Sequence, residues 1–283
     1  MTDRDEERAV LSMNFSKTHS QQLAQVDGKI EEILNQYSEH PLNSPLRYAL
    51  RGGKRLRPLV LLLVNDALGR GEEDPLPAAS AVEILHTISL IHDDFIDNAS
   101  ERRKMKPYYM QFGLESAFLA ADFALGIVLS ISSGYKDQRI GMELAKTTIE
   151  MSGGEEQERN ILSSGRKVTF SEYLSILEMK TASLFRASAK IGALLSKRPE
   201  MAERMAKFGI EIGMAYQLRD DLADMDKKGE LSSLLDGYDS EENKIKRIED
   251  EAARRLGIAL KELKGLEDSY SLRKLTALLT DYF

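Results

Sequence analysis

Hydrophobic residues recur along most of this chain at the spacing of amphipathic helices, roughly every three to four residues. The pattern is clear in "HSQQLAQVDGKIEEILNQYSEH" (19–40). The segment "LPAASAVEILHTISLIHDDFID" (76–97) is apolar nearly all round, which predicts a buried central helix. We find no strict alternation of apolar and polar residues, no repeat of solenoid period and no Pro-rich linker. We therefore expect an all-α fold.

The same spacing predicts helices over most of the remaining chain, with short connections between them. A polar loop at 226–244 precedes two charged amphipathic helices. Short connections favour a single-domain bundle of long helices spanning residues 1–283, with about residues 1–10 as a frayed tail. The further predicted helices cover 57–68, 115–132, 139–152, 170–195, 199–225, 245–264 and 266–282.

Composition narrows the classes of protein to consider. The 283 residues are 42% hydrophobic and 30% charged, which is typical of a globular protein. There is no cysteine, so disulfides and thiolate metal sites are excluded. The formal net charge of -7 argues against a general nucleic-acid-binding protein. We find no apolar run of membrane-spanning length and no signal peptide, and therefore expect no membrane span and a cytoplasmic location.

The end of the predicted central helix carries an acidic box. His86, Leu90, Asp93 and Asp97 follow the spacing i, i+4, i+7 and i+11, which places them on one helical face. Asp94 lies to one side of that face. A single box of this kind is more often a solvent-exposed helix end than a functional site.

A second segment, "GMAYQLRDDLAD", repeats the arrangement far along the chain. Gly213, Gln217, Asp220 and Asp224 have the same spacing, and Asp221 again lies to one side. If the two helices face each other, six carboxylates line one cavity. Two like charges ~4 Å apart repel by ~4 kcal/mol at a moderate effective dielectric. Mg²⁺, which prefers a few carboxylates plus phosphate oxygens, would relieve that repulsion. Two matching boxes therefore indicate a metal-assisted site for a polyanionic substrate.

Three groups of basic residues complement the carboxylates. "LRGGKRLRP" (50–58) places basic residues on a Gly-Gly turn that enters a helix, where an anion can approach the backbone closely. Arg102 and Arg103 follow the first box, and the pair 180–181 lies among small and apolar residues of a predicted helix. Arginine forks suit a phosphate held at two points. Lys180 considered alone is more often a surface lysine.

Together these segments resemble a trans-isoprenyl diphosphate synthase of the polyprenyl synthetase family, with geranylgeranyl diphosphate synthases as the nearest type. The motifs that carry the resemblance are "GGKRLRP", "LHTISLIHDDFID", "RR", "KTASLF" and "YQLRDDLAD". The resemblance implies an all-α bundle around a deep central cavity, usually as a homodimer. It implies Mg²⁺-dependent head-to-tail condensation of isopentenyl diphosphate with an allylic diphosphate, in which the proton is lost to the released diphosphate.

The resemblance also assigns roles to individual residues. It implies about three Mg²⁺ ions per active site, held by Asp93, Asp94, Asp97, Asp220, Asp221 and Asp224. The residues expected to hold isopentenyl diphosphate are Gly53, Lys54, Arg57, His86 and Arg103. Those expected to hold the allylic diphosphate are Arg102, Lys180, Thr181, Gln217 and Lys228. The catalytic core among them is Asp93, Asp97, Arg102, Lys180 and Asp220.

In this family, bulky residues about one turn before the first box limit the length of the product. Those positions are Ile88 and Ser89 here, with Leu85 a turn deeper, and none is aromatic. At ~1.5 Å per helical residue, Ser89 lies ~6 Å and Leu85 ~12 Å from Asp93 along the axis. We expect a geranylgeranyl-type or longer product. Candidate floor residues farther down the cavity are Phe118 and Phe123.

The sequence departs from the family pattern in two places within its first two-thirds. After Arg102 and Arg103 the family usually has Gly-x-Pro-Thr and then His, whereas this chain reads "KMKPYYMQFG". The family's Gly-Gln-x-x-Asp element becomes "GGEEQERN", with Gln157 and Glu158 as loose substitutes.

A third departure lies in the loop after the second box. "KKGELSSLLDGYDS" keeps Lys228 but has Ser233 and Tyr238 where the family has Asp and Lys. The altered loop leaves open a non-catalytic subunit that modulates an active synthase. A class I terpene cyclase would also need acidic boxes in an α-bundle, but it would not need the second diphosphate site that "GGKRLRP" provides.

Overall fold

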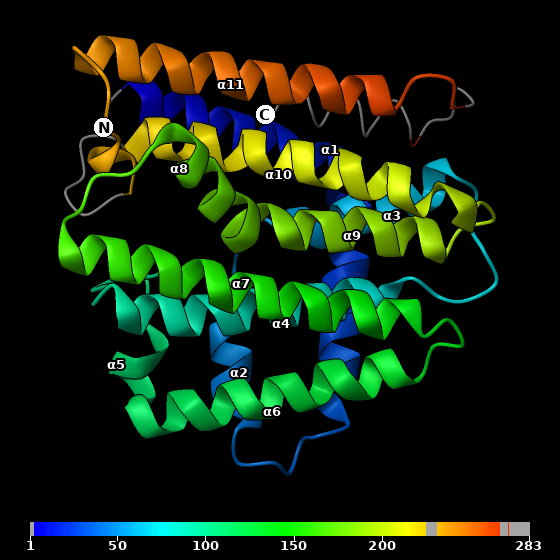
Figure 1. Cartoon of the computed structure of the whole chain (residues 1–283). Helices are drawn as coiled ribbons and strands as arrows, with labels where there is room; N and C mark the ends of the chain where they lie inside the picture. Colours follow the sequence, from blue (N-terminus) through cyan, green and yellow to red (C-terminus); the bar gives the residue numbers. More distant parts are fainter. Residues whose placement is uncertain (1–2, 225–230, 267–270, 272–283) are drawn as a thin grey trace.

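The chain folds into stacked layers of long helices. The computed structural model describes residues 3–224, 231–266 and 271, with residues 3–18 and Asp224 described as backbone only. Within those residues there are helices, turns and isolated bridges but no β-strand. Figure 1 shows α11 lying along α10, α9 beside α10, and α7 with α4 in the next layer above α6. The predicted all-α fold is confirmed.

The helices follow the hydrophobic pattern, but several details differ. The predicted helix 170–195 is divided by a π-helical turn, α7 continues well past the predicted end at 152, and three short helices were not predicted. The first helix covers 3–35 instead of 19–40 and includes most of the expected frayed tail, and nearly all of the predicted helix 266–282 lies outside the described residues. The elements are α1 (Asp3–Asn35), α2 (Asn43–Ala49), α3 (Leu56–Ala67), α4 (Leu76–Ile96), α5 (Tyr108–Phe112), α6 (Leu114–Ser133), α7 (Arg139–Ser164), α8 (Phe170–Leu177), the π-helix η1 (Glu178–Ala182), α9 (Ser183–Leu194), the 3₁₀ helices η2 (Pro199–Met201) and η3 (Leu231–Leu234), α10 (Ala202–Asp224) and α11 (Glu241–Glu262).

The core forms where α3, α4, α9 and α10 pack together. As predicted, α4 is buried on most of its circumference, from Ala78 through Ile91. The α3 run Leu59–Val64 is almost fully buried, and Gly192 of α9 lets the two helices approach closely, since a Cβ there would lie 2.4 Å from the Leu61 carbonyl oxygen. Because α4 and α10 both end in an acidic box, this packing fixes where the two boxes lie.

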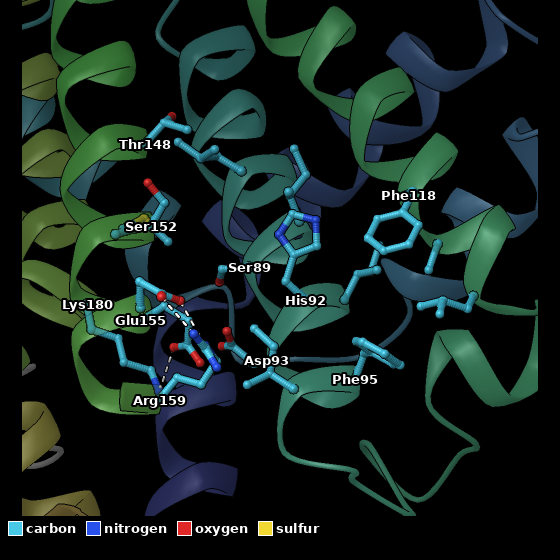
Figure 2. Close-up of a pocket in the computed structure, with 18 residues that line it drawn as sticks. Ser89, His92, Asp93, Phe95, Phe118, Thr148, Ser152, Glu155, Arg159 and Lys180 are labelled. Carbon is cyan, nitrogen blue, oxygen red and sulfur yellow. Dashed lines mark hydrogen bonds and ion pairs between the residues drawn. The ribbon is translucent and has the colours of Figure 1, made fainter. Parts of the chain in front are cut away.

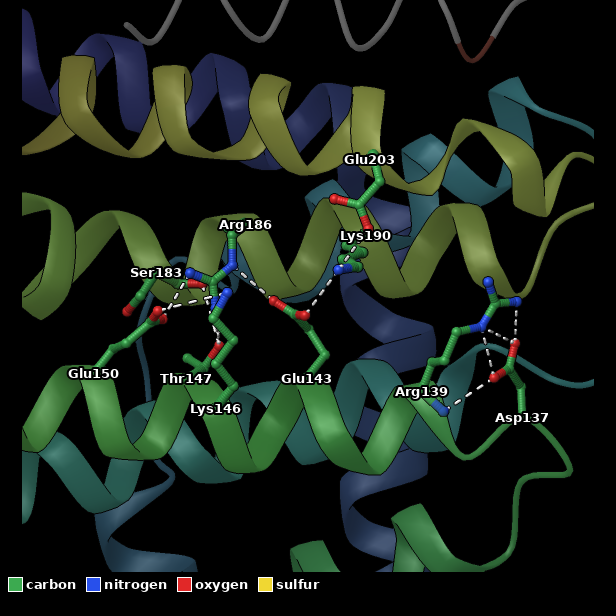
Figure 3. Close-up of polar contacts among 10 residues, drawn as sticks. All are labelled: Asp137, Arg139, Glu143, Lys146, Thr147, Glu150, Ser183, Arg186, Lys190 and Glu203. Carbon is green, nitrogen blue, oxygen red and sulfur yellow. Dashed lines mark hydrogen bonds and ion pairs between the residues drawn. The ribbon is translucent and has the colours of Figure 1, made fainter.

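A buried ion network joins α7 to α9 (Figure 3). Arg186 of α9 donates from Nε to Glu143 at 2.7 Å and from Nη2 to Thr147 at 3.2 Å, and its Nη1 pairs with Glu150 at 2.6 Å. Lys190 bridges Glu143 to α10 through Glu203. Each buried charge has an opposite partner, as burial of charge requires. The network holds the first half of α7 in a fixed place beside α9.

Helix α6 corrects one expectation from the sequence. An 18-residue window of this 20-residue helix has a mean hydropathy of 1.8, and 33% of that window is buried, so by length and composition the helix could cross a membrane. Alanines on one face pack against α4, and the opposite face leaves Phe118, Leu119 and Leu129 more than half exposed. The sequence therefore does contain one apolar run of that length, although a helix packed on a protein core passes the same test.

Candidate active site

The first acidic box forms one wall of a polar cavity. Asp93 lines that cavity, and Asp97 lies one turn later at the exposed C-terminal end of α4. Asp94 points elsewhere. It is buried and accepts hydrogen bonds from Arg102, with Oδ1 2.7 Å from Nε and 2.5 Å from Nη2. The first aspartate of the box therefore faces the cavity, while the second anchors the following loop.

The second box, on α10, is divided in the same way. Asp220 lines the polar cavity, whereas Asp221 is buried. The Asp221 carboxylate accepts a hydrogen bond from the Tyr173 hydroxyl at 2.5 Å and another from Gln217 Nε2 at 2.6 Å. Gln217 Oε1 in turn accepts from Thr181 Oγ1 at 2.9 Å. The structure thus brings Thr181 and Gln217 together, as the sequence predicted, and adds Tyr173, which the sequence did not suggest.

The polar cavity between these walls has a volume of about 370 Å³. Asp93 and Asp220 both line it, together with the cationic residues from the Gly-Gly turn. Among the side chains described, no group of three acidic or histidine residues is already gathered closely enough to hold a metal ion. Of the six carboxylates that were predicted to lie together, Asp93 and Asp220 line the cavity, from opposite walls. A charged substrate can bind between them.

Arg57 and His86 lie side by side in the lining of this cavity. Nη1 of Arg57 lies 3.2 Å from Nε2 of His86, and the guanidinium stacks 4.7 Å from the Phe185 ring centroid. Burial, and then the neighbouring Arg57, lower the pKa of His86 well below its usual value. His86 is thus neutral and can accept from Arg57. The buried Nε of Arg57 has no hydrogen-bond partner within the described part of the chain. An anion in the cavity would supply one.

Arg103 reaches the same cavity across the Gly-Gly turn. Its Nη1 donates to the carbonyl oxygens of Arg51 and Gly52 at 3.0 and 3.1 Å. Gly53 makes this possible, because a Cβ there would lie 2.6 Å from Arg103 Nη2. Arg103 and Lys104 both have positive φ, 53° and 63°, in the tight turn closed by reciprocal backbone hydrogen bonds between residues 102 and 105. Lys104 therefore occupies a left-handed position where the family usually has glycine.

Lys180 is held by two glutamates of α7. Its Nζ lies 2.8 Å from Glu155 and 2.5 Å from Glu158, and the ammonium lines both the polar cavity and the neighbouring apolar pocket. The expectation that Gln157 substitutes for a family residue is wrong, because Gln157 is exposed while Glu155 and Glu158 contact Lys180. The spacing Gly-Glu-x-x-Glu at 154–158 could have predicted that both glutamates point the same way, since positions i and i+3 share a helical face.

Lys180 and Thr181 lie in the π-helical turn η1, which is packed between two glycines. A Cβ on Gly154 of α7 would lie 2.8 Å from the Lys180 nitrogen, and one on Gly213 of α10 would lie 2.7 Å from the Ala182 Cα. Both helices therefore pass directly against η1. A π-turn inserts one extra residue into a helix and is frequent at functional sites. Here it lies where α7, α10 and the cavity meet.

An apolar pocket of about 420 Å³ opens beside Asp93 between α4, α6 and α7 (Figure 2). It shares Ser89, Asp93 and Lys180 with the polar cavity, so the two meet at the acidic box. Figure 2 shows the rings of Phe95 and Phe118 across the pocket from Lys180. The predicted chain-length residues that line it are Leu85, Ile88, Ser89 and Phe118.

Phe123 does not line this pocket, contrary to expectation. Its ring stacks on His40 at a centroid distance of 4.0 Å and meets Tyr37 edge-on at 5.6 Å. It therefore packs on the opposite side of α6 from Phe118. The side chains of Asp224 and Lys228, which were also predicted to take part, lie outside the described residues. Lys54 is exposed at the rim of the polar cavity.

The electrostatics of the site favour a cation beside Asp93. Burial, and then the nearby Glu155 carboxylate, raise the pKa of Asp93 from 3.8 to about 7. The Glu158 and Glu155 carboxylates hold the pKa of Lys180 well above its usual value despite burial. Lys180 thus supplies one positive charge to a group of acidic residues. The acidic oxygens fit a hard divalent cation such as Mg²⁺, which prefers carboxylate and phosphate oxygens.

Comparison with known proteins identifies the family of this site. A family model described as polyprenyl synthetase matches residues 39–248, which is most of the chain. The chain belongs to the polyprenyl synthetase family. It is 37% identical over 230 residues to a geranylgeranyl diphosphate synthase of Methanosarcina mazei, covering 79% of this chain and 71% of that protein. A farnesyl diphosphate synthase of Bacillus subtilis is 33% identical over 267 residues, covering 87% and 90% of the two chains.

Solved structures of polyprenyl synthetase relatives have the same fold. A geranylgeranyl pyrophosphate synthetase from Geoglobus acetivorans superposes with a TM-score of 0.77 at 29% identity, covering 92% of this chain and 97% of that chain. A geranyltranstransferase from Thermotoga maritima gives a TM-score of 0.80 at 28% identity, covering 93% and 97%. The long-helix bundle is therefore the fold of the family.

Proposed function

We propose that this polyprenyl synthetase is a prenyltransferase that condenses isopentenyl diphosphate with an allylic diphosphate to give a linear prenyl diphosphate. The observation that carries the proposal is the junction at Asp93 and Lys180, where a polar cavity meets an apolar pocket. The polar cavity can take two diphosphates between cationic and acidic walls, and the apolar pocket can take a hydrocarbon tail. The names of the relatives, which include farnesyl and geranylgeranyl diphosphate synthases, support the same reaction.

The acidic residues fit Mg²⁺ as the metal of the reaction. Burial, and then the neighbouring Glu155 carboxylate, raise the pKa of the half-buried Asp93, so a bound cation would favour its ionised form. We assign Asp93, Asp97 and Asp220 as the main ligands, with Asp94, Asp221 and Asp224 in supporting roles. Bound Mg²⁺ would stabilise the negative charge of the departing diphosphate. About three ions per site is the number that the family resemblance implies.

Two different sets of residues would bind the two diphosphates. Arg57, with its unpaired Nε, and neutral His86 line the side that we assign to isopentenyl diphosphate, together with Arg103 above Gly53. Lys180, Thr181 and Gln217 line the other side, which we assign to the allylic diphosphate with Arg102. Arginine and lysine contacts to phosphate are charge-assisted and therefore strong.

The reaction then follows from these positions. The allylic carbon–oxygen bond breaks, and the diphosphate leaves with the electron pair. The double bond of isopentenyl diphosphate attacks the allylic cation and forms the new carbon–carbon bond. A proton is then lost from the product cation to the released diphosphate. The apolar residues of the pocket keep water away from the cation, so that carbon–carbon bond formation competes successfully with hydrolysis.

We further propose that the protein acts as a cytoplasmic homodimer. The outer faces of α6 and α7 carry exposed apolar side chains, among them Phe118, Leu119, Leu129, Met142 and Ile149. Exposed apolar side chains, where they gather on one face, are characteristic of a protein–protein interface. A second copy of the chain, pairing across this face, would bury it.

The apolar pocket supports a geranylgeranyl-type or longer product. Ser89 and Ile88 line the pocket within about one turn of Asp93, and neither side chain would block a growing tail as an aromatic ring would. Phe118, farther along the pocket, is the remaining candidate for its floor. Ser89→Phe or Ile88→Phe should therefore shorten the main product to the farnesyl length without abolishing condensation.

Product analysis tests this function directly. The purified chain is incubated with isopentenyl diphosphate, Mg²⁺ and allylic primers of increasing length, and the products are identified by mass spectrometry. We expect linear prenyl diphosphates, with shorter ones from Ser89→Phe. Cyclic hydrocarbons formed from the allylic substrate alone would indicate a terpene cyclase, and no product with any primer would indicate a non-catalytic subunit. A farnesyl product from the wild type would contradict the interpretation of the pocket.

A further inference from the structure

Asp221 is a buried carboxylate that accepts hydrogen bonds from two neutral side chains. The Tyr173 hydroxyl donates to it at 2.5 Å and the Gln217 amide at 2.6 Å. A carboxylate accepts hydrogen bonds but donates none when ionised. Each neutral donor that it loses therefore leaves buried negative charge less well solvated.

The hydrogen bonds continue from Asp221 to the cavity. Because the carboxylate only accepts, the NH₂ end of the Gln217 amide must face Asp221, and Oε1 must face away from it. Oε1 lies 2.9 Å from Thr181 Oγ1, so the threonine hydroxyl donates to it. Thr181 and Gln217 both line the polar cavity. The orientation of Asp221 thus sets the orientation of two cavity side chains.

Tyr173 is the first residue in this series of hydrogen bonds, and it lies outside the cavity. It is fully buried and packs in a second apolar cluster with residues such as Val168, Met214 and Leu218. It lines neither the polar cavity nor the apolar pocket. The hydrogen bond from its hydroxyl to Asp221 is therefore the route by which we expect it to act on the cavity.

Helix α8, which carries Tyr173, is held at its N-terminus by a side-chain cap and by backbone hydrogen bonds. Thr169 caps α8, with its Oγ1 accepting from the Glu172 nitrogen at 3.2 Å. Just before the cap, Val168 pairs with the segment that follows the second acidic box, through backbone hydrogen bonds to Leu234 and from Asp236 of 3.0 and 2.9 Å. The α8 N-terminus is thus tied on one side to the segment beyond the box and, through Tyr173, to the box itself.

We propose that Tyr173 is a positioning residue for the condensation, whose hydroxyl orients Asp221 and, through it, Gln217 and Thr181 toward the allylic diphosphate. The inference rests on the proposed function and adds a residue to the machinery. We expect its reach to be one side of the cavity, because the hydrogen bond and the ring contact of Arg57 are with His86 and Phe185, which are not part of this series.

The test uses Tyr173→Phe, which keeps the buried ring and removes only the hydroxyl. A hydrogen bond to a charged group typically changes an equilibrium by roughly tenfold to a hundredfold. We expect kcat/KM for the allylic substrate to fall by at least about tenfold, while KM for isopentenyl diphosphate stays within about twofold. A purely structural role would lower the amount of active enzyme and leave both Michaelis constants unchanged, which would overturn the proposal.

Tyr135→Phe is the matched control. Tyr135 is also a buried tyrosine with two hydrogen bonds, donating to the Asp74 carbonyl oxygen at 2.7 Å and accepting from the Ala78 nitrogen at 2.9 Å, but it lies outside both cavities of the site. We expect it to leave both Michaelis constants unchanged even where it lowers Tm. If it reproduced the allylic defect of Tyr173→Phe, loss of any buried tyrosine hydroxyl would explain the result, and the specific role of Tyr173 would be wrong.

A double-mutant cycle asks whether Tyr173 acts through Gln217. In a Gln217→Ala background the end of the series is absent, so Tyr173→Phe should have little further effect on allylic kcat/KM. Full additivity of the two substitutions would contradict the route through Asp221.

A binding measurement separates this inference from the proposed function. The probe is an allylic diphosphate analogue with sulfur in place of the bridging oxygen, titrated calorimetrically with Mg²⁺ present, and it needs no turnover. We expect Tyr173→Phe to weaken its binding by about tenfold relative to the wild type and to Tyr135→Phe. Equal affinity in all three proteins would overturn the positioning role, whereas a wild type that binds the analogue but forms no product would overturn the proposed function alone.

Discussion

The two acidic boxes have the same sequence spacing but different supports. In both, the first aspartate faces the polar cavity and the second is buried. Asp94, near the end of α4, is held by the guanidinium of Arg102 in the loop that follows. Asp221 accepts hydrogen bonds from neutral donors, one of them Tyr173 from a separate helix. An ion pair thus supports the first box, and hydrogen bonds from neutral side chains contribute to the support of the second.

This difference shows how one motif can be built into two kinds of structure. The ion pair of Asp94 also fixes Arg102 at the rim of the cavity, so the first box and its loop form one unit. The hydrogen bonds of Asp221 instead link α10 to α8 and to Thr181 of η1 through Gln217. We therefore expect the first box to be sensitive to loss of charge and the second to loss of individual hydrogen-bonding groups.

The largest effects should come from what the boxes share, their cavity-facing aspartates. Asp93→Ala or Asp220→Ala should lower kcat by several orders of magnitude, because each removes a ligand from one wall of the site. Steady-state assays at saturating isopentenyl diphosphate and Mg²⁺ measure this. Near-normal turnover in either variant would mean that the two walls do not act together.

The pH dependence of the free energy of unfolding is the control for the Asp93→Ala variant. Because the folded pKa is raised from 3.8 to about 7, the folded protein holds this proton more tightly than the unfolded chain does. Without metal, the free energy of unfolding should therefore fall as pH rises from about 4 to about 7. Asp93→Ala should remove that part of the pH dependence while the protein stays folded.

The next largest effects should separate the two diphosphate sides. Arg57→Ala should raise KM for isopentenyl diphosphate by roughly tenfold to a hundredfold, and Lys180→Ala should do the same for the allylic substrate, since each loses a charge-assisted contact. Each variant serves as the control for the other. If both variants raised both Michaelis constants equally, the assignment of the two sides would be wrong.

Smaller effects should distinguish the supports themselves. Asp94→Asn leaves Arg102 without its carboxylate and should cost about 1–3 kcal/mol of unfolding free energy, even though the guanidinium is partly exposed. Asp221→Asn keeps a side chain that can still hydrogen-bond to Tyr173, and should cost only about 0.5–1.5 kcal/mol. Denaturant unfolding measures both. Equal losses would argue that charge and neutral donors support the boxes to the same degree.

Much of the fold could be predicted because helical periodicity is a local property of the sequence. The limits of α4 and α6 agree with the structure to within about two residues. The π-turn at 178–182 was not predictable, because one inserted residue does not disturb the apolar pattern of a helix that is buried nearly all round. It packs against Gly154 and Gly213, which come from other helices.

The site was predictable where spacing alone decides it. Asp93, Ser89 and Leu85 lie on the expected side of α4 because positions four apart share a face. Phe123 was misplaced because α6 is apolar on both faces, so its sequence does not tell which side faces the pocket. Tyr173 could not have been found, since its link to Asp221 depends on how α8 packs against α10.

The central claim is that both acidic walls hold one diphosphate through Mg²⁺. Calorimetric titration of an unreactive allylic diphosphate analogue tests it most directly, with the wild type, Asp93→Ala and Asp220→Ala compared in the presence and absence of Mg²⁺. We expect tight binding by the wild type only with Mg²⁺, and loss of that metal-dependent binding in each single variant. Wild-type affinity in either variant, or binding by the wild type that does not change when Mg²⁺ is removed, would contradict it.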